Sequence, residues 1–140
     1  MKFKLTRKAI QMPAVPYYGL QQNGIGYLDL NSFPVDCSKD VRKAFLEMKK
    51  DGMKSLVLDL RNNGGGSLQE AINIVNMFVP KGLVLVNTKG KLERANREYK
   101  TTVEPIDTLI PIVVLVNDET ASASEITSGS LQDLDRAVIL

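Results

Sequence analysis

Histidine is absent from this 140-residue chain, and cysteine occurs only once, at Cys37. Without histidine, the chain itself supplies no Ser-His-Asp triad. The single thiol has no partner for a disulfide within the chain and no histidine to activate it, so it is expected to be a partly buried structural group. No apolar run is long enough to span a membrane or to form the core of a signal peptide. A net charge of +2 gives no indication of a nucleic-acid or membrane partner.

Serines and small residues follow an apolar run near the end of the chain. Residues 112–116 read as a buried strand, and the stretch TASASEITSGSLQD at residues 120–133 reads as the start and body of a helix. A serine at a helix N-terminus lies near unpaired backbone N–H groups and the positive end of the helix dipole. Such groups stabilise a developing oxyanion, which favours acyl transfer.

A serine nucleophile needs a base that takes its proton. Because histidine is absent, the remaining usual base is a lysine whose pKa is lowered by burial. The sequence therefore predicts a mechanism that uses a serine and a lysine.

Three motifs in this order resemble the carboxyl-terminal processing proteases, also called tail-specific proteases. They are GYLDLNSF at residues 26–33, DLRNNGGGSL at residues 59–68, and TASASEI followed by SLQD. Three ordered motifs in one short chain are far more specific than any one of them. The resemblance extends from about residue 10 to residue 140. It implies an α/β fold of the crotonase-like or Clp-like kind, a spiral of ββα units, here truncated at its C-terminal side.

The resemblance places the nucleophile at Ser122, with Ser124 as the alternative. Reasoning from the residues alone leaves both open, since both lie near the helix N-terminus. The competing interpretation for each is helix capping, and for Thr120 capping is the favoured one.

The resemblance also implies an oxyanion hole that combines the backbone N–H of Ala123 with one from the glycine loop, Gly66 first and Gly65 second. Glycine allows the chain to turn sharply and to approach a substrate carbonyl. A phosphate-binding loop is excluded in detail, because no Lys-Ser or Lys-Thr follows the glycines and Gln69 breaks the GxGxxG spacing.

In the family the base is a lysine in a Gly-Lys-Gly segment, which is expected beyond Leu140, so the 140 residues alone are expected to be inactive. If a base lay within the chain, Lys100 or Lys91 would be tested first. Glu125, in the first turn, is expected to cap the helix. Asp133 closes the helix, where a carboxylate is electrostatically disfavoured, so it is expected to have a specific partner and to brace the site, with a direct catalytic role as the alternative. No cofactor or metal is implied.

Strands are expected at residues 24–30, 54–60, 82–88, 91–101, 112–117 and 137–140, and helices at residues 38–50, 67–79 and from 120 to 133. Ser67 and Glu70 have the spacing of a capping box. Residues 1–12 are expected to end a preceding domain or linker, which in the family is a PDZ domain, and residues 13–140 to form part of a protease core. An exposed sheet edge at the C-terminal side would permit self-association.

The function implied by the resemblance is a serine endopeptidase that cleaves proteins or peptides near their C-termini, in the bacterial periplasm, cell envelope or outside the cell. The alternatives are a non-catalytic binding module or degenerate homologue of the same fold, and an acyl-thioester enzyme of the crotonase type. The latter would use the paired N–H groups without the serine. A Gly-Lys-Gly segment shortly after Leu140 would favour the protease.

Overall fold

The computed structural model describes residues 3, 6, 12–89 and 96–140. Its main sheet has the strand order β1-β2-β3-β6-β7. Strand β1 (Tyr17–Leu20) runs antiparallel to β2 (Ile25–Asp29), and β3 (Ser55–Asp59), β6 (Ile112–Leu115) and β7 (Val138–Ile139) continue from β2 in parallel. A short 3-10 turn, η1 (Gln22–Gly24), joins β1 to β2. The carboxyl ends of β2, β3 and β6 therefore meet at one edge of the sheet.

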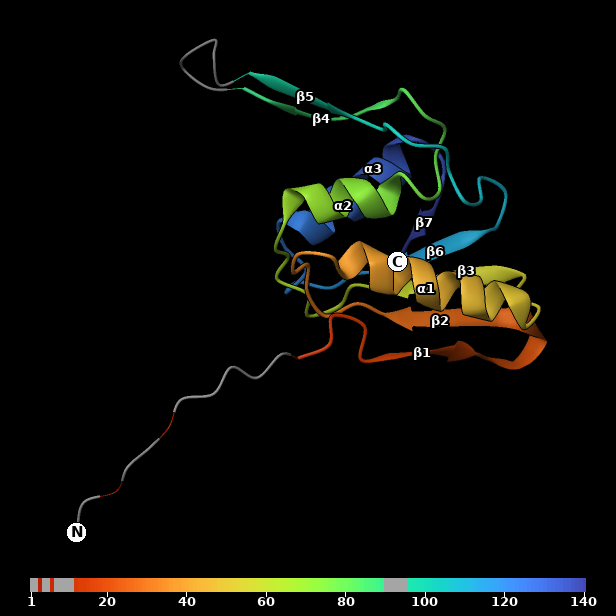
Figure 1. The fold of residues 1–140 in the computed structure, drawn as a ribbon. Helices are drawn as coiled ribbons and strands as arrows, with labels where there is room; N and C mark the ends of the chain where they lie inside the picture. Colours follow the sequence, from red (N-terminus) through yellow and green to blue (C-terminus); the bar gives the residue numbers. More distant parts are fainter. Residues whose placement is uncertain (1–2, 4–5, 7–11, 90–95) are drawn as a thin grey trace.

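Helices α1 (Cys37–Lys50), α2 (Leu68–Val75) and α3 (Ala123–Asp133) pack next to one another, α2 between the other two (Figure 1). The apolar residues that repeat at helical spacing along α1 are buried, namely Val41, Ala44, Phe45 and Met48, and Gly52, at a φ of 96°, follows the helix end. None of the helices in the described ranges is long and apolar enough to cross a bilayer.

The core lies between the helices and one face of the sheet. Alternate residues of the strands point into it, including Leu28, Leu56 and Val114, while the α1 side chains Phe45 and Met48 approach from the other side. Gly26 on β2 leaves room for Met53, whose sulfur would lie 2.1 Å from an added Cβ. Burial of this face fixes the register of the strands, because a shift by one residue would expose every core side chain.

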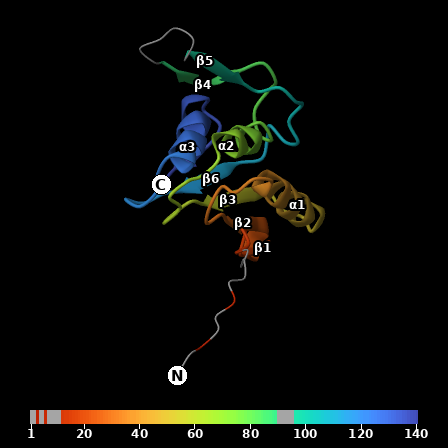
Figure 2. The same ribbon diagram turned by 60° about the vertical axis from the view of Figure 1, so that its left-hand side comes forward.

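A second, two-stranded sheet stands apart from the first. Strands β4 (Val84–Thr88) and β5 (Arg97–Lys100) form an antiparallel pair beyond α2 and α3 (Figures 1 and 2). The pair agrees with the strands predicted at residues 82–88 and 91–101, although the beginning of the second, at residues 91–95, lies outside the described residues.

The structure confirms the predicted α/β class and corrects three local predictions. Strand β1 was not expected from the sequence. Helix α2 ends at Val75 rather than near Val79, because the N–H groups of Met77 and Phe78 bond carbonyls three residues back instead of four, so the chain continues as turns.

The predicted capping box forms only in part. The hydroxyl of Ser67 accepts the N–H of Glu70 at 3.4 Å, but the Glu70 carboxylate reaches across to the N–H of Ser38, at 2.8 Å, in the first turn of α1. Glu70 thus satisfies a free donor at the start of a different helix.

Candidate active site

Ser122 occupies the turn between β6 and α3. It is the N-cap of α3, it is exposed, and its backbone has a φ of 58° and a ψ of −115°. A non-glycine residue with a positive φ is uncommon, and such strain is retained where the surroundings enforce it. The Ser122 N–H donates to the Glu125 carboxylate at 2.6 Å, the capping contact expected for a first-turn acid.

Ser124, two residues further on, has a different environment. Its side chain is fully buried, and its hydroxyl donates to the backbone oxygen of Asn63 at 2.9 Å. Thr120 does not cap the helix as expected. Its hydroxyl donates to the Leu60 carbonyl at 2.9 Å and accepts the Asn117 N–H at 2.9 Å, because it lies two residues before the N-cap. Of the three hydroxyls, that of Ser122 is on the exposed residue.

The glycine loop lies directly against the Ser122 turn. A Cβ added to Gly65 would be 2.8 Å from the Ser122 Cβ, 2.8 Å from the Ala123 nitrogen and 2.7 Å from the Ala121 oxygen. One added to Gly66 would be 2.5 Å from the Phe33 oxygen. Both glycines also have positive φ, 94° and 148°. The absence of side chains therefore allows the glycine loop to contact the Ser122 turn at Gly65 and the Phe33 backbone at Gly66.

The two glycine N–H groups differ in their partners. That of Gly65 donates to the side-chain oxygen of Asn63 at 2.9 Å. Those of Gly66 and Ala123 donate to none of the described residues. Buried backbone N–H groups are seldom left without an acceptor, and Ala123 is buried. An unbonded donor directly after an exposed serine, with a second one in the adjoining glycine loop, has the chemistry of an oxyanion hole.

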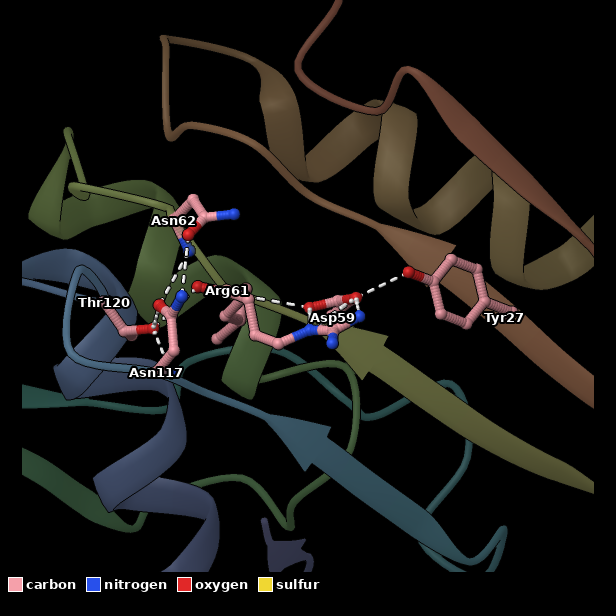
Figure 3. A network of polar contacts seen from close by, with 7 residues as sticks. Tyr27, Asp59, Arg61, Asn62, Asn117 and Thr120 are labelled. Carbon is pink, nitrogen blue, oxygen red and sulfur yellow. Dashed lines mark hydrogen bonds and ion pairs between the residues drawn. The ribbon is translucent and has the colours of Figure 1, made fainter.

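A polar network joins the loops at the carboxyl ends of the strands (Figure 3). The side chains of Asn62 and Asn117 bond at 2.6 Å, and the Asn62 N–H donates to the Asn117 side-chain oxygen at 2.9 Å. Beside them, Asp59 accepts hydrogen bonds from both Arg61 and Tyr27. The sequence motifs contain several of these residues, but the pairing of Asn62 with Asn117 and of Tyr27 with Asp59 could not be read from spacing, because these partners are 55 and 32 residues apart.

This network borders an open pocket of ≈ 620 Å³ with a polar lining. Its walls come from the ends of three neighbouring strands and the loops that follow them, and comprise Tyr27, Asp29, Asn31, Asp59, Arg61, Asn62 and Asn117. A crevice at the carboxyl ends of parallel strands is a frequent ligand-binding position.

Asp29 and Asp59 are register partners on β2 and β3, yet their pKa values move in opposite directions. Burial raises the pKa of Asp29, and the negative charge of Asp59 adds to this. Burial also acts to raise the pKa of Asp59, but hydrogen bonds from Arg61 and Tyr27 outweigh it and lower the pKa overall. The phenol pKa of Tyr27 is raised by its bond to Asp59. Asp59 is thus held as a carboxylate.

Asp133 is the last residue of α3 and is exposed, and its side chain bonds none of the described residues. The partner that its position suggested is not found among them. Lys100 forms an ion pair with Glu98 at 2.9 Å on the outlying β5, and Lys91 lies outside the described residues. Neither lysine is placed by the described structure as a base for Ser122.

The thiol of Cys37 is buried at the start of α1, and burial followed by the nearby Glu70 carboxylate raises its pKa to about 12. A thiol in this state is unreactive at neutral pH. The described residues contain no cluster of acidic or thiol groups that would hold a metal ion.

An α/β sheet that places an exposed serine in a strained strand-to-helix turn, beside a glycine loop with an N–H that none of the described residues accepts, is an arrangement found in acyl-transferring hydrolases. The family model described as Peptidase family S41 matches residues 24–140. The chain therefore belongs to peptidase family S41.

Individual relatives agree with this assignment. A probable CtpA-like serine protease of Staphylococcus aureus is 36% identical over 137 residues, which is 97% of this chain and 27% of that protein. A carboxyl-terminal-processing protease of Picosynechococcus is 38% identical over 141 residues, 98% of this chain and 33% of that protein. The chain thus spans a third or less of the length of these curated relatives.

Among solved structures, the photosystem II D1 C-terminal processing protease matches with a TM-score of 0.78 and 32% identity, over 96% of this chain and 37% of that one. The predicted resemblance to carboxyl-terminal processing proteases and the predicted fold class are confirmed.

Proposed function

We propose that this chain is the nucleophile-bearing part of a serine endopeptidase that cleaves protein or peptide substrates near their C-termini through an acyl-enzyme. The observation that carries this proposal is the exposed Ser122 in a strained turn, in contact with a glycine loop and adjacent to the Ala123 N–H, which none of the described residues accepts.

In this mechanism the Ser122 hydroxyl attacks the substrate carbonyl and forms a C–O bond, while its proton passes to a base. The carbonyl oxygen takes up the electron pair and is stabilised by the N–H groups of Ala123 and Gly66. Collapse of this intermediate releases the C-terminal product, whose amine leaves with the proton, and water then hydrolyses the ester. Gly65 is the poorer second donor because its N–H already bonds Asn63.

A lysine beyond Leu140 is proposed as the base. The chain has no histidine, and Lys100 is ion-paired on the outlying β5. The proposed roles of Glu125 and Asp133 are to fix the start of α3 and to brace the site from its far end. Residues 13–140 would then be part of the catalytic core, preceded by a PDZ domain, in a protein of the bacterial periplasm, envelope or exterior.

The test uses the longest chain that carries these residues and compares Ser122→Ala with Ser124→Ala. Loss of the nucleophile should lower turnover of a peptide by at least about 1,000-fold. It should cost only about 1 kcal/mol of stability through weakened capping. Ser124→Ala removes a buried hydrogen bond and should cost stability, about 1–3 kcal/mol, with part of the activity retained.

Hydrolysis rates and thermal unfolding of both variants decide the assignment. Normal turnover by Ser122→Ala together with an inactive, folded Ser124→Ala would transfer the nucleophile to Ser124. If the unmodified long chain turned over no peptide at all, the family fold would here serve as a non-catalytic module.

A further inference from the structure

We infer that the side-chain amide of Asn63 is a positioning group that turns the Gly65 N–H inward and so leaves the Gly66 N–H as the oxyanion donor. This inference rests on the proposed peptidase function and adds a residue to its machinery. Asn63 itself touches neither substrate nor the reacting atoms.

Asn63 connects the three segments that build the site. Its side chain is fully buried, its Nδ2 donates to the carbonyl of Leu30 at 2.5 Å, and its Oδ1 accepts the Gly65 N–H at 2.9 Å. Its backbone oxygen accepts the N–H of Ala121 at 3.1 Å and the hydroxyl of Ser124 at 2.9 Å. One residue therefore holds the end of β2, the glycine loop and the nucleophile turn together.

The chemistry of these contacts requires an amide. The side chain must donate to one carbonyl and accept from one N–H at the same time, which a carboxylate cannot do because it only accepts. An aspartate at this position would set its charge against the Leu30 carbonyl and near the developing oxyanion. Glutamine has the right groups but an additional methylene in a fully buried space.

The consequence for catalysis follows from the packing of the loop. The Gly65 Cα faces the Ser122 Cβ and the Ala123 nitrogen, so any rotation of the Gly65 peptide unit alters the loop beside the nucleophile. With the Gly65 N–H bound to Asn63, the exposed Gly66 keeps an N–H that none of the described residues accepts. Loss of the amide would free the loop and remove a fixed donor, and such a donor is worth about 100-fold to 1,000-fold in kcat.

Asn76 provides a matched control. It is also buried, at 3% exposure, its Nδ2 donates to the Val103 carbonyl at 2.8 Å, and its Oδ1 accepts the Thr102 N–H at 2.8 Å. It makes the same kind of contacts as Asn63 but ties α2 to a loop that contributes nothing to the site. Asn76→Ala should therefore lower stability without changing the oxyanion donors.

The experiment measures kcat and KM for a peptide, and the affinity of a peptide aldehyde, which forms a tetrahedral adduct with a serine. The variants are Asn63→Ala, Asn63→Asp, Asn76→Ala and Ser122→Ala in the longest chain that carries these residues. We expect both Asn63 variants to lose about 10-fold to 1,000-fold in kcat. KM should change less than about threefold, and the aldehyde should bind more weakly by a factor similar to the loss in kcat.

A pH series separates positioning from general destabilisation. The carboxyl group that Asn63→Asp introduces both donates and accepts when it is protonated, as the amide does. The kcat of Asn63→Asp relative to wild type should therefore rise toward low pH, whereas the ratio for Asn63→Ala should stay flat. If Asn63→Ala does not fold, Asn63→Asp still provides this test.

Equal losses of kcat in Asn63→Ala and Asn76→Ala, or a change confined to KM, would overturn the inference while leaving the peptidase intact. Full turnover by Ser122→Ala would instead overturn the proposed function, and the inference with it.

Discussion

At the residue scale, the neighbouring residues Gly65 and Gly64 differ in the space that each leaves for a side chain. Gly65 has a positive φ and no space for a Cβ, because atoms of Ala121, Ser122 and Ala123 all lie within 2.8 Å of where that atom would be. At Gly64 the same atom would meet nothing within 4 Å. Contact with the nucleophile turn, rather than flexibility of a glycine-rich stretch, therefore explains the glycine at position 65.

Gly65→Ala should consequently damage the site far more than Gly64→Ala. The added methyl group should cost about 1–3 kcal/mol through overpacking. Displacement of Ser122 by about 1 Å would reduce kcat by roughly 100-fold. Gly64→Ala is the control and should remain close to wild type in both respects. Peptide turnover and thermal unfolding measure the two effects, and equal behaviour of the variants would show that the contact at Gly65 is unimportant.

Sequence reasoning pointed to the segments of the candidate site but not to how they are held together. Ser122, Ala123 and Gly66 lie in motifs that indicate their chemistry, and the structure brings the two loops into contact. The role of Asn63 was not predicted, because its partners Leu30 and Ser124 are 33 and 61 residues away. Asn-Asn before a glycine run is locally the composition of an ordinary turn.

At the element scale, strands β2 and β3 end in paired carboxylates with opposite effects on stability. The pKa of Asp59 is lowered in the folded protein, so its ionisation stabilises the fold above the pKa of the unfolded chain, and this contribution is lost as pH falls through the folded value. The pKa of Asp29 is raised, so its ionisation opposes folding once the pH exceeds the unfolded value.

At pH 7, we therefore expect Asp59→Asn and Asp29→Asn to change the free energy of unfolding in opposite directions. The first should lower the free energy of unfolding by about 1–3 kcal/mol, because charge-assisted bonds from Arg61 and Tyr27 are lost. The second should raise it. As the pH falls, the Asp29 difference should disappear below the unfolded pKa of about 3.9. The Asp59 difference should shrink as the pH passes through its lowered folded pKa. Urea unfolding followed by circular dichroism across this range provides the measurement, and a destabilised Asp29→Asn at pH 7 would contradict the assignment.

Helices and strands could be predicted where burial in the core imposes a regular pattern of apolar residues. The runs at β3 and β6 and the spacing along α1 are dictated by one continuous core, and their predicted and observed positions agree closely. Strand β1 lacks this pattern, since Tyr17, Tyr18 and Leu20 are all exposed or nearly so at the edge of the sheet. The end of α2 was missed because its last turn tightens to three-residue bonds before Pro80, a change that the apolar pattern of the sequence does not reveal.

At the scale of the whole molecule, the 140 residues should contain the nucleophile without its base. The purified chain should turn over an unfolded protein substrate at least about 100-fold to 10,000-fold more slowly than a longer chain that includes the segment after Leu140. Binding of a peptide aldehyde to the same two chains shows whether the site is formed. The Ser122→Ala variant serves as the control that cannot form the adduct. Strong turnover by the 140 residues would require a base within them, and Lys100→Met would be the first variant to test.

The hydrogen bonds that shape the Ser122 turn also determine when it forms during folding. They join residues that are 55, 60 and 61 positions apart, across the whole stretch between β3 and β6. Contacts of such long range form only after the intervening chain has closed its loop, so they come late. A nascent or locally opened chain therefore carries an ordinary serine hydroxyl, and the arrangement proposed for catalysis would arise only together with the completed sheet.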